Sequence, residues 1–309
     1  MTMEQVPLSP ATSATGSIYD LGYQGYDGPR LGRRHAVGAL LEHSLKGSFG
    51  IGRGGRAKIA PIGLAALAVI PAVVAVGVQA LISRAGVSSD EVGSPIRYDT
   101  YYAYVQTIIM LFVAAQAPEL LGRDQRYSVL SLYFSRALRR SDYALAKAAA
   151  FITAILIVVL VPQSIIFVGL TLSDRDVLAA FRENVASVPP IVAEGLAIAV
   201  LLGMIGLAIA AYTPRRAYAT AAIIAVFIVP QVAAAIVGQA ARGEFTRYVV
   251  LLSPGDVLDG LNAFLFDRSP ANRPVVRADL PGELYAATVV VVVIVLLAVL
   301  VRRYQRITA

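Results

Sequence analysis

The chain has 309 residues, of which 57% are hydrophobic and only 15% are charged, and its mean hydropathy is +0.67. Soluble domains average about 25% charged residues, so this composition excludes a soluble globular protein and indicates an all-α, polytopic integral membrane protein. The sequence has no cysteine and two histidines, which excludes disulfides and thiolate metal sites. The net charge of +7 is interpreted as a topology signal, so nucleic acid is not expected as a partner.

The chain begins with a segment rich in Ser, Thr, Pro and Ala, and residues 1–33 are predicted to form a disordered or extended cytoplasmic tail. Residues 34–58 are predicted to form an amphipathic interfacial helix and a hinge, with the helix lying on the inner leaflet. Its apolar face consists of Val37, Leu40, Leu41, Ser44, Leu45 and Phe49. "GIGRGG" at 50–55 matches G-x-G-x-x-G, but a membrane span follows it and no strand precedes it, so a hinge is favoured over a dinucleotide site.

Six apolar runs are predicted to cross the bilayer within a membrane domain over residues 59–305. They lie at 60–83, 102–121, 144–171, 189–212, 217–240 and 284–303, and each has about the 20 residues that a span needs. With the N-terminus inside, about 18 of the 27 Lys and Arg residues fall in inner segments, and about 13 of the 20 Asp and Glu residues fall in or beside outer ones. The positive-inside rule then predicts a multi-pass plasma-membrane protein with both termini in the cytoplasm.

A short helix is predicted at about 254–266, between spans five and six, on the outer side of the membrane. In "SPGDVLDGLNAFLF", Ser253 is a suitable N-cap, Pro254 fits the first turn, and Asp256 follows three residues after the cap. This outer helix is interpreted as a lid over the helix ends or as a gate.

Four polar residues inside or beside the spans are candidates for a substrate pathway or gate. They are Glu119, Gln163, Glu194 and Gln231, the two glutamines lying in a repeated "VPQ" string. Polar groups within spans either mark function or form hydrogen bonds between helices, and the sequence leaves both interpretations open. No Ser/His/Asp set and no facing pair of carboxylates is found in the spans, so the chain is not expected to be an enzyme.

The segment 120–147 is strongly basic and lies between the second and third spans. Asp124 is a suitable cap at its start, and Arg139 and Arg140 suit the negative end of a helix. A helix at about 125–140, lying across the cytoplasmic surface, is predicted from an apolar stripe with spacings of three and four, formed by Leu130, Tyr133, Phe134, Ala137 and Leu138.

This layout resembles that of ABC-type-2 permeases, the membrane subunits of exporters powered by a separate ATPase. The resemblance rests on "APELLGRDQRYSVLSLYFSRALRRSDYALAK", and particularly on Asp124, "LYFSRALRR", Asp142-Tyr143 and Lys147. The "IYDLGYQGYDGPRLGRR" lead at 18–34 looks like the N-termini of actinobacterial members. The chain departs from the pattern at Ala137, where a proline is common.

The resemblance implies that 125–140 is a coupling helix that docks in a groove of an ABC ATPase, of which two copies are expected. The coupling residues would be Leu130, Tyr133, Phe134, Arg136, Leu138, Arg139 and Arg140. It further implies a dimer with a second permease, identical or homologous, and ATP used by the partner alone, since this chain has no P-loop and is expected to bind no cofactor itself. The alternatives are a secondary transporter or channel that needs no ATPase, and a membrane scaffold or immunity protein.

Overall fold

The computed structural model describes residues 31–85, 96–135, 138–174, 176–240 and 244–306, together with Gly28, and these ranges contain no β-strand. The described residues from Gly32 onward belong to one compact unit. The tail predicted over 1–33 lies outside the described residues except at Gly28 and from residue 31 onward. Its last two residues belong to helix α1 (Gly32–Ser48), so the helix begins earlier than predicted.

Six helices are long and apolar enough to cross a membrane, and each contains one of the predicted spans. They are α2 (Gly55–Arg84), α4 (Tyr98–Arg126), α6 (Arg140–Ser173), α8 (Val188–Tyr212), α9 (Arg216–Ala240) and α12 (Gly282–Gln305). The shortest has 24 residues. At 1.5 Å per residue it is about 36 Å long, enough for a hydrocarbon core of about 30 Å. The chain is therefore a multi-pass membrane protein, and the predicted all-α fold with six spans is confirmed.

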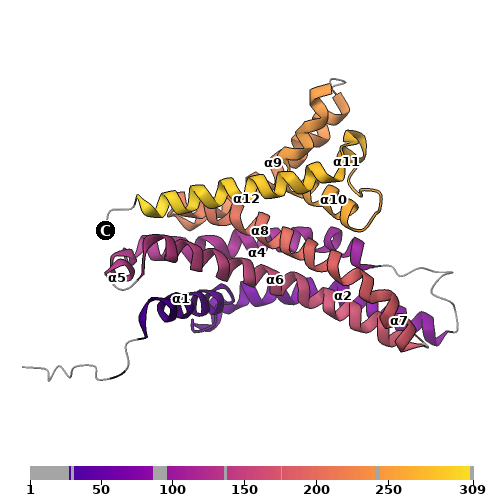
Figure 1. Ribbon diagram of the computed structural model, residues 1–309, viewed down its shortest axis with the longest axis horizontal. Helices are drawn as coiled ribbons and strands as arrows, with labels where there is room; N and C mark the ends of the chain where they lie inside the picture. The colour runs from indigo at the N-terminus through magenta and orange to yellow at the C-terminus, as the bar shows by residue number, and fades with distance from the viewer. Residues whose placement is uncertain are drawn as a thin grey trace, which may run out of the picture. The chain divides into compact units, whose positions relative to one another are not determined.

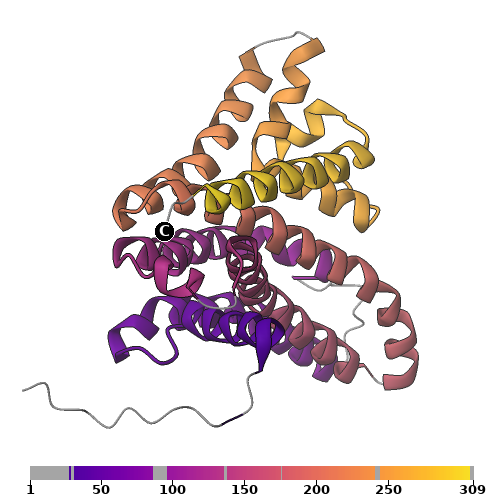
Figure 2. The same ribbon diagram turned by 60° about the vertical axis from the view of Figure 1, so that its left-hand side comes forward.

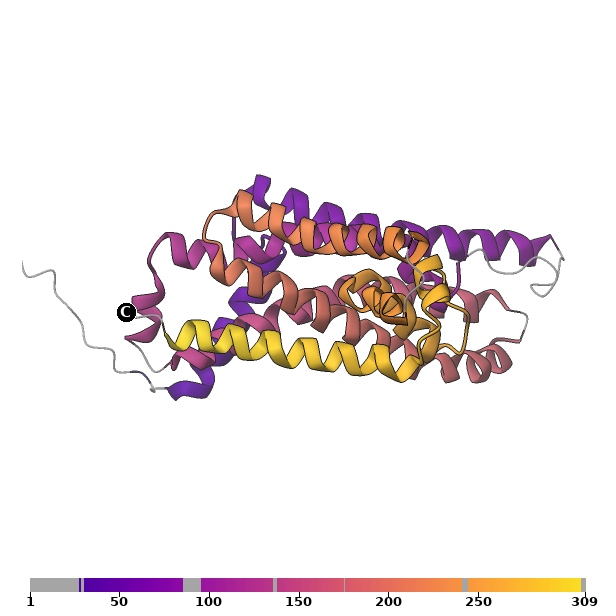
Figure 3. The same cartoon turned by 90° about the horizontal axis from the view of Figure 1, so that it is seen from above.

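Short helices cover both ends of this bundle. They are α1, α5 (Leu130–Phe134), α7 (Val177–Asn184), α10 (Pro254–Leu265) and α11 (Arg273–Ala278), together with the 3-10 turns η1 (Val185–Ser187) and η2 (Glu244–Leu252). Figures 1 and 3 show α1, α5 and the end of α12 at one end of the bundle, and α7, α10 and α11 at the other. We call the first the basic end, after Arg123, Arg139, Arg140, Arg215, Arg216, Arg302 and Arg303. The second is called the opposite end.

Helices α4 and α8 form the centre of the bundle. Within their most apolar 18-residue windows, 61% of the α4 residues and 72% of the α8 residues are buried, against 17–22% for α2, α9 and α12. Figure 2 shows α1 and α2 on one side of the α4, α6 and α8 layer, and α9 and α12 on the other. Small residues allow α4 and α8 to approach each other closely. An added Cβ on Gly206 of α8, for example, would lie only 2.5 Å from Val113 Cγ1 of α4.

Helix α1 lies against the protein's own spans rather than on the membrane surface alone. It packs on α6 and α4, with Leu40 and Ser44 of the predicted apolar face buried. The ring of Phe49 lies 5.9 Å from that of Phe112 in α4. The predicted hinge after α1 is a tight turn in which Gly50 and Gly52 have φ values of +71° and +84°. A Cβ on Gly50 would lie 2.6 Å from the carbonyl oxygen of Ala57, so the turn requires glycine there.

Helix α10 confirms the predicted short helix between the fifth and sixth spans. The Ser253 hydroxyl accepts a hydrogen bond from the backbone N–H of Asp256 (3.3 Å), and Pro254 is the first helical residue. The helix is buried from residue 254 to residue 263 and packs on α8, α9 and α12. It is therefore an integral part of this end of the bundle, and its role as a lid or a gate stays a prediction.

Candidate functional site

The connection between α4 and α6 is not the single helix predicted over 125–140. Helix α4 continues to Arg126, a turn follows with Ser128 at φ +53°, and α5 spans only five residues. Arg136 and Ala137 lie outside the described residues, and α6 begins at Arg140. Ser128 has a left-handed backbone conformation, which L-residues adopt only as single residues. A right-handed helix cannot continue through it, so α4 and α5 are separate helices.

The described residues of the apolar stripe face the protein's own bundle. Leu130 and Leu138 are buried. The rings of Tyr133 and Phe134 lie 5.5 and 6.0 Å from the ring of Tyr143 in α6, and burial raises the pKa of Tyr133. The side chains predicted to dock on a partner are therefore used, at least in part, to attach α5 to the bundle.

Asp124 was predicted to cap a helix, but this prediction is wrong. The residue lies inside α4 and takes part in a polar cluster. Its Oδ2 atom lies 2.8 Å from Lys147 Nζ and accepts a hydrogen bond of 2.7 Å from the Tyr143 hydroxyl. Lys147 also donates to the carbonyl oxygen of Leu120 (3.3 Å), and its side chain is only 5% exposed. A buried ammonium group is tolerated only when it is paired in this way, so the pair ties α4 to α6.

Two further contacts join other helices to this cluster. Gln125 donates hydrogen bonds to the Tyr304 hydroxyl of α12 (3.1 Å) and to the carbonyl oxygen of Ala211 in α8 (3.2 Å). The rings of Tyr143 and Tyr304 lie 5.0 Å apart. Residues of α4, α5, α6, α8 and α12 thus meet around Tyr143.

Helix α1 is attached to the start of α6 by a two-pronged ion pair. Arg33 donates from Nε and Nη2 to the two carboxylate oxygens of Asp142, at 2.7 and 2.6 Å. The same carboxylate accepts the backbone N–H of Arg139 (3.0 Å) and so caps α6. Asp142 therefore fixes the beginning of α6 and the position of α1 together.

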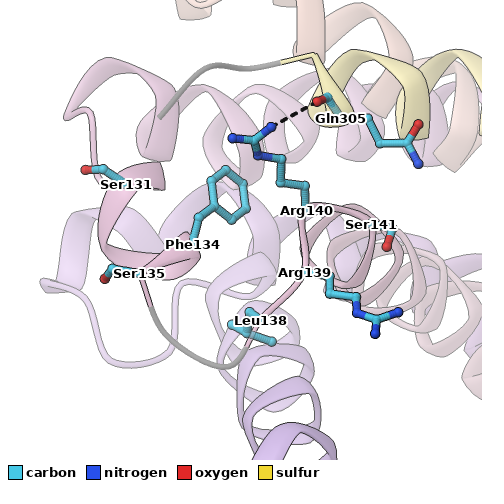
Figure 4. A pocket seen from close by; sticks show the side chains of 8 residues that line it. All are labelled: Ser131, Phe134, Ser135, Leu138, Arg139, Arg140, Ser141 and Gln305. Atoms are coloured by element: carbon cyan, nitrogen blue, oxygen red, sulfur yellow. Dashed lines mark hydrogen bonds between the residues drawn. The ribbon is translucent and has the colours of Figure 1, made fainter.

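A groove of about 690 Å³ opens beside α5, between the start of α6 and the end of α12. Figure 4 shows Phe134 and Arg140 side by side in it, with the Arg140 guanidinium 5.8 Å from the ring centroid and donating to the Gln305 carbonyl oxygen (3.2 Å). The predicted residues Phe134, Leu138, Arg139 and Arg140 line this groove, together with Ser131, Ser135, Ser141 and Gln305.

The apolar side chain most exposed on α5 is Leu132, at 66%, and Tyr127 in the preceding turn is 67% exposed. Neither was among the predicted docking residues. Leu132 falls between the predicted stripe positions. The sequence gave no sign of its exposure, because helical spacing marks the face that is buried and not the face that remains free.

Glu194 is buried at the opposite end in a second polar cluster. Its Oε1 atom accepts a hydrogen bond of 2.5 Å from the Asn262 amide of α10, whose own oxygen accepts from Arg268 Nε (2.7 Å). The Glu194 Oε2 atom and the buried Tyr102 hydroxyl have no hydrogen-bond partner among the described residues. Arg268 also approaches Asp259 at 3.5 Å, so this cation contacts Asp259 of α10 directly and is linked to Glu194 of α8 through Asn262.

The segment that follows α10 is held down by the acidic residues of that helix. Asp259 accepts the backbone N–H groups of Ala271 and Asn272 at 3.2 and 2.8 Å, and the Asn272 amide donates to Asp256 Oδ1 at 3.1 Å. Burial raises the pKa of Asp256, while hydrogen bonds from Ser253 and Asn272 oppose the shift and Asp259 adds to it.

Changing Asp256 to Asn is expected to reduce the dependence of folding stability on pH. The pKa of Asp256 in the folded protein is raised, so between the ordinary carboxyl pKa and this raised value the folded chain holds a proton that the unfolded chain has lost. Stability therefore falls as the pH rises through that window. Thermal unfolding of the purified protein across a pH series measures this slope, with the exposed Asp267→Asn as the matched control. Identical profiles for wild type and Asp256→Asn would contradict the prediction.

The four predicted pathway residues do not form one site. Glu119 pairs with Arg53 (3.4 Å) and with Arg216 at the start of α9 (2.8 Å), at the basic end, whereas Glu194 belongs to the cluster at the opposite end.

Gln163 is buried and donates to the carbonyl oxygen of Tyr98 (3.2 Å). The Gln231 amide reaches the first turn of α10, since a Cβ on Gly255 would lie 3.6 Å from its nitrogen. Each glutamine thus has its own neighbours, and any role in a pathway stays a prediction.

Comparison with known proteins yields no match to a family model and none to a curated protein.

Proposed function

We propose that the chain is the permease subunit of an ATP-binding-cassette exporter in the plasma membrane, with its basic end in the cytoplasm. The excess of Lys and Arg at the basic end supports this orientation, because positive residues near the span ends remain on the cytoplasmic side. Helix α1 and the end of α12 lie at that end (Figure 1), which agrees with an even number of spans and two cytoplasmic termini.

The observation that carries the proposal is the attachment of α5 to several spans at once. The Tyr143 ring receives Tyr133 and Phe134 of α5 and also contacts Tyr304 of α12. Asp124 and Lys147 join α4 to α6, and Asp124 also accepts a hydrogen bond from the Tyr143 hydroxyl. A force applied to α5 is therefore transmitted to α4, α6 and α12 together, which is what a separate motor protein requires. Apart from Tyr304, the residues that make this joint are among those on which the resemblance to ABC-type-2 permeases rests.

In this proposal the ATPase docks on the exposed side of α5 and in the adjoining groove. Leu132 supplies an exposed apolar contact, and Arg139 and Arg140 supply positive charge at the groove. Two ATPase copies bind and hydrolyse ATP, and a second permease chain, identical or homologous, completes the pathway. Closure of the ATPase pair pushes both α5 connections and opens a path between the two permeases.

Purification of the tagged chain from its native membranes tests the function. The proposal predicts that a soluble subunit with a P-loop is recovered in a stoichiometric amount and that the complex hydrolyses ATP. Mass spectrometry identifies the subunit, and phosphate release measures the activity. Recovery of a folded permease without any ATPase, and transport by that permease alone in proteoliposomes, would overturn it.

Ion-coupled secondary transport is the second candidate, and the Glu194 cluster favours it. A buried carboxylate with an oxygen that has no hydrogen-bond partner among the described residues is an arrangement that transporters use for coupling ions. Transport by the chain alone that follows an imposed ion gradient and is lost in Glu194→Gln would favour this candidate over the exporter.

A further inference from the structure

A cavity of about 220 Å³ lies at the basic end, between α1, the turn that follows it, α4 and α6. It is separate from the groove beside α5. Its lining is rich in basic side chains and glycine, and consists of His43, Ser44, Lys46, Gly47, Ile51, Gly52, Arg53, Glu119, Leu120, Arg123, Asp124 and Lys147.

The carboxylates of this cavity already have partners. Glu119 pairs with both Arg53 and Arg216, and Asp124 pairs with Lys147 and accepts from the Tyr143 hydroxyl. Three cations thus share two carboxylates, and no described carboxylate lies within ion-pair distance of Arg123, which also lines the cavity. The cavity therefore carries a surplus of positive charge.

The crowding of cations is also evident at Arg53, which lies in the turn after α1. The pKa of Arg53 is lowered by burial first, and then by the neighbouring charges of Arg123 and Arg216, while Glu119 and Asp124 oppose the shift. An anion placed in the cavity would relieve this repulsion. Lys147 has one further N–H to offer, because its described partners are Asp124 Oδ2 and the Leu120 carbonyl oxygen.

The turn itself leaves room for such an anion. Apart from Gly52 itself and its two chain neighbours, no residue has an atom within 4 Å of the position that a Cβ on Gly52 would take. Ile51, Gly52 and Arg53 of the "GIGRGG" string, which does not fit a dinucleotide site, form one wall of the cationic cavity.

We propose that this cavity binds a phosphate group through Arg53, Arg123 and Lys147. Guanidinium groups bind phosphate in a two-pronged geometry, and several such contacts in a partly buried site are stronger than contacts at an open surface. The cavity is formed where the amphipathic helix α1 meets the spans, which is the level of lipid headgroups in a membrane protein. The phosphate belongs to an anionic lipid or to a free phosphate anion, and the two sources are distinguished by experiment.

The test uses the full-length protein purified in detergent and compares Arg123→Gln with Arg126→Gln. Both arginines are exposed in the last turn of α4, but only Arg123 lines the cavity. Thermal unfolding is followed while dioleoyl-phosphatidylglycerol, the phosphate-free dioleoylglycerol, or inorganic phosphate is titrated. We expect stabilisation by phosphatidylglycerol and not by dioleoylglycerol, with an apparent affinity about tenfold or more weaker in Arg123→Gln and unchanged in Arg126→Gln.

The outcomes separate the sources of the phosphate. Stabilisation by phosphatidylglycerol alone assigns the site to lipid, whereas saturable stabilisation by inorganic phosphate, lost in Arg123→Gln, assigns it to the free anion. Native mass spectrometry, which detects retained phospholipid, provides a second reading that does not depend on thermal stability. Equal responses of the two variants to every ligand, or equal stabilisation by phosphatidylglycerol and dioleoylglycerol, would overturn the proposal.

Discussion

Replacing Lys147 with methionine is expected to destabilise the folded protein by about 3–5 kcal/mol, because the change leaves the Asp124 carboxylate without its cation. The Lys147 side chain is 5% exposed and that of Asp124 is 16% exposed, so water offers the remaining charge little compensation. Adding Asp124→Asn should recover most of the loss, since the double variant buries no charge at this site. Unfolding of the purified proteins by heat and by denaturant measures the effect.

Lys46→Met is the matched control for this prediction. Lys46 pairs with Glu42 at 2.5 Å one helical turn away, but both side chains are more than half exposed. Exposed pairs of this kind contribute at most about 1 kcal/mol. Similar losses in Lys147→Met and Lys46→Met, or no recovery in the double variant, would show that the Asp124–Lys147 pair does not join α4 to α6 as described.

Changing Leu132 to Ser is expected to weaken binding of the proposed ATPase by roughly thirtyfold while leaving the permease folded. An apolar side chain at the centre of a protein interface contributes about 2 kcal/mol or more, whereas loss of a side chain that is 66% exposed removes little packing within the chain itself. Affinity purification of the complex and its ATP hydrolysis rate measure the effect.

The control is Leu172→Ser, because Leu172 near the end of α6 has the same exposure of 66% but lies away from α5. It should retain full ATPase binding. Unchanged binding in Leu132→Ser would remove α5 from the docking surface. The paired change Tyr133→Ala with Phe134→Ala is a poorer test, since both rings contact Tyr143 and their loss would also detach α5 from the bundle.

The spans and helix α10 could be predicted because their causes are local in the sequence. A run of about 20 apolar residues is sufficient for a span, and each of the six helices contains its predicted run. For α10, the serine cap and the proline in the first turn mark the start of the helix within one segment. Such signals do not depend on the position of any other helix.

The arrangement around α5 could not be predicted, because it depends on residues distant in sequence. An apolar stripe looks the same whether it will meet a partner, the lipid or the chain's own spans, and here it meets Tyr143. Asp124 has the sequence context of a helix cap, yet its partner is Lys147, 23 positions further along the chain. Likewise, nothing in the sequence near Glu119 indicates that it will contact both the turn after α1 and the start of α9.

The central position of α8 has a consequence for how the protein is made. Spans enter the bilayer in chain order, so α2, α4 and α6 are present before α8 arrives and packs against both α4 and α6. During that interval the Asp124–Lys147 pair is able to form, because both of its members belong to the earlier spans. Glu194, in contrast, enters with α8 and finds the Asn262 amide only after α10 has been synthesised. We therefore expect the basic end to assemble early during synthesis and the opposite end to be completed last.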